Sequence, residues 1–210
     1  MLRELEYVIK DGKVYIKNTL FLVFKERSLV KYAIIAIGLM LLIALPILYA
    51  YGYLRELFNI ILLISSITLT VLFSARFYGL KINVIRMGRS VGEIRPAVSK
   101  DGIKYLVRLE GRPLITYIIP KEGGLKNSTI EYGDRHYRVS IHYLRDHYEI
   151  RVFDKESNQD VVFISELPKK SSWGVRVSGI DVLSALTIAY VVIKSLVIKP
   201  LRTTQTSFIE

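Results

Sequence analysis

The sequence predicts a membrane-anchored, mainly-β protein, in which a two-helix transmembrane hairpin carries an antiparallel β-barrel or sandwich with a C-terminal hydrophobic helix. Two uncharged runs, residues 32–54 and 57–75, are each long enough to cross about 30 Å of hydrocarbon as a helix. From residue 79 to 178, short alternating segments are separated by turn residues about every ten positions, as in sandwiches and barrels. A last apolar stretch, residues 180–198, follows them.

Composition supports this class. The chain has 210 residues, 51% of them hydrophobic, and a net charge of +11. Such a charge is typical of a membrane protein whose basic part lies on the cytoplasmic face near anionic headgroups, and we do not predict nucleic acid as the partner. The absence of cysteine excludes disulfides, thiolate metal sites, cysteine nucleophiles and palmitoylation. The scarcity of Asn, Gln and Met suggests a thermophilic source.

Residues 1–31 are predicted to form cytoplasmic β-strands, from about Leu5 to Phe24, that are candidates for part of the barrel. Polar and apolar residues alternate on both sides of the dipeptide Asp11-Gly12, which is a strong hairpin signal. A signal peptide is not expected, because the first apolar run begins only after thirty residues.

Residues 32–78 are predicted to form the transmembrane hairpin, with a short turn at Arg55 and Glu56. Neither run alternates as a strand does, and a bilayer accepts only helices or closed barrels. Lys and Arg are concentrated before residue 32 and after residue 75, whereas the turn carries only Arg55. The positive-inside rule therefore places the N-terminus and the β domain in the cytoplasm, and the protein in the cell membrane.

The β domain is predicted over residues 79–200, followed by a flexible tail over 201–210. Its expected turns are 110–113, 133–134, 144–146 and 155–159. Four prolines of this region fall at segment edges, where strand prolines belong. The domain is therefore expected to consist of antiparallel hairpins.

Residues 180–198 are predicted to form a helix in the core of this domain. The polar positions of this helix fall on one broad side, and they are Asp181, Ser184, Thr187, Lys194 and Ser195. The uncharged stretch 182–193 has only twelve residues, which is shorter than a bilayer requires. A third transmembrane span is the alternative, because Lys194 can extend its ammonium group to the membrane interface.

Two segments resemble the end of the tubby-like superfamily, which includes the phospholipid scramblases and the LURP-one-related proteins. The first, HYEIRVFDKESNQDVVFISEL, is a strand, a turn after Asp154 and a returning strand. The second, SSWGVRVSGIDVLSALTIAYVVIKS, is a strand followed by Asp181 and an apolar helix, and YVIKDGKVYIK near the N-terminus is similar to the first. The resemblance implies a closed barrel of about a dozen strands around one hydrophobic C-terminal helix. The hairpin would then be an insertion in a loop, and the barrel would lie directly beneath the membrane.

The candidate lipid-headgroup residues are basic and flank the predicted hairpin. They are Lys25, Arg27, Lys31, Arg76, Lys81, Arg86 and Arg89. Each would gain about 1 kcal/mol near an anionic surface, although the same charges also fit a role in setting the membrane topology alone. The resemblance implies lipid recognition, as tubby-like domains bind headgroups.

The predicted function is therefore a non-enzymatic, membrane-anchored protein that senses, binds or helps to move anionic lipids. The alternative is an accessory or structural subunit of a multi-protein membrane complex, in which the hairpin contacts partner proteins or a second copy of the chain. No catalytic residue, metal or cofactor is predicted. A hydrolase or metal enzyme would depend on His136, His142 and His147, and the sequence contains no nucleophile elbow, P-loop or dinucleotide motif.

Overall fold

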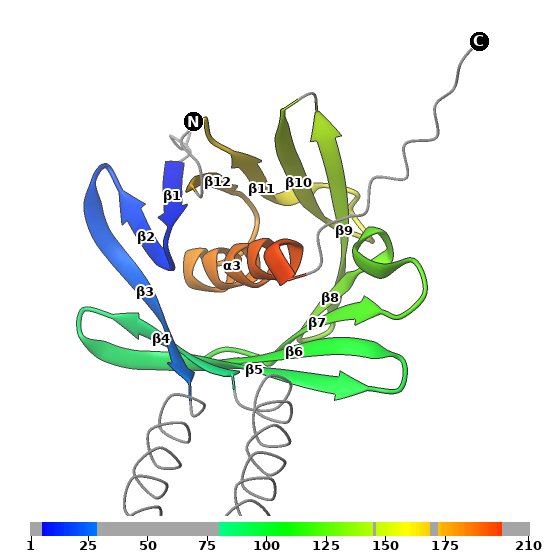
Figure 1. Ribbon diagram of the computed structural model, residues 1–210, viewed down its shortest axis with the longest axis horizontal. Helices are drawn as coiled ribbons and strands as arrows, with labels where there is room; N and C mark the ends of the chain where they lie inside the picture. The colour runs from blue at the N-terminus through cyan, green and yellow to red at the C-terminus, as the bar shows by residue number, and fades with distance from the viewer. Residues whose placement is uncertain (1–5, 29–79, 145, 169–171, 199–210) are drawn as a thin grey trace, which may run out of the picture.

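A computed structural model describes residues 6–28, 80–144, 146–168 and 172–198 of the chain. In this part of the chain, the strands form one closed antiparallel barrel around a single α-helix, α3 (Figure 1). The predicted mainly-β fold with a C-terminal hydrophobic helix is confirmed. The predicted transmembrane hairpin, 32–78, lies outside the described residues. Among the helices that the structure describes, none combines the length and the apolarity needed to cross a bilayer.

The elements follow one another along the chain as hairpins. They are β1 (Glu6–Lys10), β2 (Lys13–Ile16), β3 (Thr19–Ser28), β4 (Leu80–Arg86), β5 (Arg89–Ser99), β6 (Gly102–Leu109), β7 (Ile115–Pro120), the 3-10 helix η1 (Gly124–Asn127), β8 (Thr129–Tyr132), β9 (Arg135–Leu144), β10 (His147–Asp154), β11 (Asp160–Glu166), β12 (Ser172–Val177) and α3 (Val182–Ile198). Each strand pairs with the next strand in the chain, and β12 pairs with β1 to close the ring. Closure leaves the sheet without an unpaired edge.

The segment 29–79 is inserted between two strands that pair directly. Ser28, the last residue of β3, is opposite Leu80, the first residue of β4. Because all neighbouring strands are antiparallel and consecutive, successive connections lie at opposite ends of the barrel. We call the end at which β3 leads into 29–79 the proximal rim. The opposite end, which carries the β4–β5, β6–β7 and β8–β9 turns, is the distal rim.

Strand alternation and turn chemistry account for the wall of the barrel. In β6, Tyr105, Val107 and Leu109 are buried, whereas Arg108 between them is exposed. Asp11 and Gly12 have φ angles of 49° and 73°, the left-handed conformation of a two-residue hairpin turn. Two further turns of this kind were not predicted: one is Lys17-Asn18, and the other is Met87-Gly88. Lys17 and Met87, at the first positions of these turns, signal such a turn less clearly than the Asp of Asp-Gly does.

Helix α3 lies inside the ring of strands and is buried on all sides (Figure 1). The third-span alternative for this segment is therefore wrong. The polar side expected for the helix is also buried, since Ser184, Thr187 and Ser195 are each at most 2% exposed. The polar side of the helix is buried because the barrel wall surrounds the helix and covers its polar and apolar sides alike. The hydroxyls of Thr187 and Ser195 donate to the helix carbonyls of Leu183 and Val192 at 2.7 Å.

Candidate functional site

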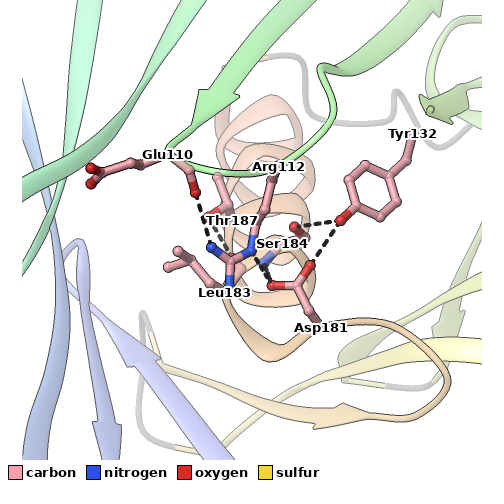
Figure 2. A network of polar contacts seen from close by, with 7 residues as sticks. All are labelled: Glu110, Arg112, Tyr132, Asp181, Leu183, Ser184 and Thr187. Atoms are coloured by element: carbon pink, nitrogen blue, oxygen red, sulfur yellow. Dashed lines mark hydrogen bonds and ion pairs between the residues drawn. The ribbon is translucent and has the colours of Figure 1, made fainter.

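A polar network attaches the start of α3 to the distal rim (Figure 2). Asp181, the residue before the helix, accepts a hydrogen bond from the backbone N–H of Ser184 at 3.1 Å, as an N-cap does. The same carboxylate accepts from the Nε of Arg112 at 2.6 Å and from the hydroxyl of Tyr132 at 2.9 Å. Arg112 belongs to the β6–β7 turn, and Tyr132 ends β8. The network therefore joins the helix to two hairpins of the wall.

The electrostatics of this network favour the charged form of Asp181. Burial alone would raise the pKa of its carboxyl, but hydrogen bonds from Ser184, Arg112 and Tyr132 outweigh burial and hold that pKa below its usual value. Arg112 is fixed in turn by its donation to the carbonyl of Glu110 at 3.2 Å. A partly buried carboxylate that accepts these three hydrogen bonds fits a structural anchor, because they fix it to the helix and to two hairpins of the wall.

Side chains of β7 and β3 hold the other half of α3. The hydroxyl of Tyr117, on β7, lies 3.3 Å from the hydroxyls of both Ser195 and Ser128, and burial raises its pKa. Nearer the proximal rim, the Nζ of Lys194 forms an ion pair with the Glu26 carboxylate of β3. The hydroxyl of Tyr190 donates to the same carboxylate at 3.4 Å, and its ring stacks on Phe24 at 3.9 Å. The helix is therefore fixed at both rims.

The predicted headgroup residues fall into three groups in the structure. Lys31 and Arg76 lie outside the described residues. Lys25 is exposed on β3, and Lys81 lies one residue after the proximal start of β4. The backbone of Arg27 is opposite that of Lys81. The strand register therefore brings the positions of Lys25, Arg27 and Lys81 together beside the point where the chain leaves for 29–79.

Arg86 and Arg89 are brought to the other end of the barrel. They face each other across the β4–β5 turn at the distal rim. Strand β4 separates Arg86 from Lys81 by about 17 Å, at 3.3 to 3.4 Å per residue. The guanidinium of Arg86 lies 4.7 Å from the centre of the Phe21 ring, a cation–π contact on the barrel itself. Nearness to residues 29–79 in sequence does not make these two arginines neighbours of Lys25 and Lys81.

Three basic residues that were not candidates extend the group around Lys25 and Lys81. Arg95 of β5 and both Lys104 and Arg108 of β6 lie on the outer side of the wall. We call the five side chains together the basic face: Lys25, Lys81, Arg95, Lys104 and Arg108. Strand alternation alone predicts that Lys104 and Arg108 share a face, but only the strand order shows which neighbours they have.

One carboxylate lies among these cations. Glu93, on β5, forms an ion pair with Lys81 and a second with Arg95 at 2.9 Å. The hydrogen bond from Lys81 is the main reason that the pKa of Glu93 is lowered, with Arg95 adding to it. Glu93 is directly opposite Arg108 on β6 and Asn83 on β4. The basic face therefore has an excess of positive charge around a single acidic residue.

Two of the three histidines, His136 and His142, lie on β9, and His147 begins β10. The Nε2 of His142 lies 2.7 Å from the hydroxyl of Ser140. His147 contacts Asp146 at 3.0 Å, and this hydrogen bond raises the pKa of the imidazole. His136 is exposed opposite Glu131. Within residues 6–28, 80–144, 146–168 and 172–198, no three His, Asp or Glu side chains are grouped as metal ligands.

Two features of the described residues bear on function: the basic face on the outer side of β3 to β6, and the core helix held at both rims. Comparison of the chain with protein-family models, with curated proteins and with solved structures finds no match.

Proposed function

We propose that this protein is a non-enzymatic, membrane-anchored lipid-binding protein, whose barrel lies in the cytoplasm against the anionic headgroups of the cell membrane. The observation that carries the proposal is the basic face, which begins near the proximal rim with Lys25, Lys81, Arg95 and Lys104 and continues along β6 to Arg108, one residue before the end of that strand. If 32–78 crosses the membrane as a hairpin, the few residues between Ser28 and the first span hold this rim close to the bilayer. The four cations of the basic face nearest this rim would each contribute about 1 kcal/mol near an anionic surface.

The resemblance to the tubby-like superfamily supports the same function. A closed antiparallel barrel of twelve strands around a C-terminal helix is compatible with that fold. Insertion of 29–79 between β3 and β4 leaves the pairing of these two strands intact, so an anchor can be inserted there without opening the barrel. We therefore propose membership of this superfamily, with lipid sensing or lipid binding as the role.

The proposal is tested by lipid selectivity of the full chain. The protein is reconstituted into phosphatidylcholine membranes that contain trace spin-labelled phosphatidylglycerol or phosphatidylcholine, and the motionally restricted fraction of each label is measured. We expect the anionic lipid to associate several-fold more strongly, and we expect this preference to disappear at about 1 M salt, where the Debye length is about 3 Å.

The informative variant is Lys25→Gln/Lys104→Gln/Arg108→Gln, which avoids the ion pairs of Glu93. Its matched control is Arg135→Gln/Arg138→Gln/Lys155→Gln, which removes the same charge from exposed positions around β9 and β10. The first variant should lose most of the preference for phosphatidylglycerol and the control should keep it. Equal losses would mean that net charge, and not this face, attracts the lipid.

The alternative, an accessory subunit of a membrane complex, depends on contacts of the predicted hairpin. Those residues lie outside the described part of the chain, so the alternative stays a prediction. It would be favoured by a partner protein that remains bound to the full chain in mild detergent while the spin-label experiment shows no lipid preference.

A further inference from the structure

A cavity of about 600 Å³ lies inside the proximal rim, between the second half of α3 and the wall. Strands β1 and β3 contribute to its lining, as do the last residue of β11 and the second residue of β12. Its volume is in the range of small-molecule sites. Figure 1 shows that these strands surround α3 on one side of the ring. A small molecule there would contact both the wall and the core helix.

The polar lining of this cavity is mainly acidic. Asp11, Glu26 and Glu166 contribute carboxylates, and Lys194 is the one basic side chain among the lining residues. Lys194 is already paired with Glu26, and Glu166 accepts one backbone hydrogen bond, from Tyr148 at 3.3 Å. The remaining carboxylate oxygens make the cavity locally negative in a chain whose net charge is +11. Such a pocket between low-dielectric walls favours a cation over an anion.

The apolar lining suits a hydrocarbon chain. Trp173, Tyr190 and Phe24 are 7%, 6% and 5% exposed, so each ring presents only a small area to the cavity. The stack of Phe24 on Tyr190 fixes two of these rings in place. An apolar wall next to carboxylates fits a molecule with a cationic end and an apolar end, and aromatic rings also attract an ammonium group.

We propose that this cavity binds an alkylammonium group: an amine cation that carries a short apolar chain. The ammonium group lies between the carboxylates of Glu26 and Glu166, and the chain packs on Trp173 and Phe24. Lys194 competes with the ligand for Glu26. This site is separate from the basic face and does not depend on the function proposed above. The amine can come from solution or from a lipid whose headgroup ends in an ammonium group, since the two share the ammonium cation.

Trp173 provides the readout, because it is the only tryptophan of the chain and lines the cavity. The full chain in mild detergent is titrated with hexylammonium, and hexanol and hexanoate serve as probes of the same chain length. We expect a saturable change of tryptophan fluorescence with hexylammonium, and a response at least ten-fold weaker with the other two. An equal response to hexanol or to hexanoate would overturn the proposal.

Three variants locate the site. Glu166→Gln leaves the Glu26–Lys194 pair intact and should weaken hexylammonium binding several-fold. Lys194→Met removes the competing cation and should strengthen it. Glu122→Gln is the matched control, since it neutralises an exposed carboxylate in the β7–β8 connection of the same rim and is not among the lining residues. Thermal unfolding verifies that each variant folds. Unchanged affinity in both Glu166→Gln and Lys194→Met would refute the assignment.

The source of the amine is distinguished in nanodiscs. The full chain is embedded in phosphatidylglycerol discs with or without a phospholipid that has an ethanolamine headgroup, and the hexylammonium titration is repeated. Weaker apparent binding in the ethanolamine discs supports a membrane-borne amine, and equal binding in both supports a soluble one. Loss of binding in every disc, with no lipid dependence, would contradict the site.

Discussion

The Nε of Arg112 donates to the carboxylate of Asp181 at 2.6 Å, so that the β6–β7 turn contacts a residue 69 positions later in the chain. This pair lies where α3 enters the barrel (Figure 2). Both side chains are about one third exposed, at 31% and 32%. Solvent therefore screens the ion pair in part, and its contribution is smaller than that of a fully buried pair.

A double-mutant cycle should detect this pair. Asp181→Ala removes the helix cap and the acceptor of both Arg112 and Tyr132, so we expect the free energy of unfolding to fall by about 2 kcal/mol. Arg112→Ala should lower the free energy of unfolding by less, because Asp181 still accepts hydrogen bonds from Tyr132 and Ser184. A coupling energy of about 1 kcal/mol is expected from denaturant unfolding of the four proteins in one detergent. Additive effects would show that the two side chains stabilise the fold independently.

The lowered pKa of Asp181 predicts a loss of stability in acid. A carboxyl whose pKa is lower in the folded chain stabilises the fold above its unfolded value, ordinarily 3.8, and loses that contribution as the pH falls through the folded value. The wild-type chain should therefore lose more stability between about pH 5 and pH 2 than Asp181→Asn does. Unfolding midpoints across this range measure the difference. Parallel profiles for the two proteins would contradict the prediction.

The burial of α3 predicts two contrasting substitutions on adjacent positions. Leu186 is 0% exposed, so Leu186→Ala should leave a cavity and cost about 3 kcal/mol of unfolding free energy. Thr187 is equally buried, but its hydroxyl donates to the carbonyl of Leu183 within the same helix. Thr187→Val should cost less than about 1 kcal/mol, since Leu183 is still bonded through the helix backbone. If Thr187→Val lowered the free energy of unfolding as much as Leu186→Ala does, the Thr187 hydroxyl would also have to contact the barrel wall.

The position of α3 inside the barrel predicts the sidedness of the C-terminus. Single cysteines at Ser99 and Ser207 of this cysteine-free chain should both react with an impermeant maleimide from the cytoplasmic side of oriented vesicles. A cysteine at Arg55, in the turn of the predicted hairpin, should react only from the opposite side. Labelling of Ser207 and Ser99 from different sides would contradict this topology.

The sequence predicted the hairpin turns well where a single dipeptide determines the backbone. Asp11-Gly12 is such a case, because its residues readily adopt the positive φ angles that the turn requires. It also predicted a buried helix near 180–198. The predicted start was two residues too early, since the helix begins at Val182 and Asp181 is its cap, which side chains from distant hairpins complete.

The candidate headgroup residues could be predicted only in part. Lys25 and Lys81 flank 29–79 in the sequence and lie on paired strands in the structure. Arg86 and Arg89 flank it in the sequence as well, yet β4 carries them to the distal rim. Distance along an extended strand grows by more than 3 Å per residue, so a few positions separate two ends of a barrel. Residues of β6 were missed because their neighbours come from other strands.

The sequence by itself determined the local features of this protein: its alternating strands, its tight turns, its apolar helix and two uncharged runs of membrane-spanning length. Each depends on residues within a few positions of one another, which the chain order contains. Tertiary structure decided that β1 closes the ring on β12, that polar helix residues are buried, and that carboxylates meet around one cavity. These features depend on side chains from distant strands, which only closure of the barrel brings into contact.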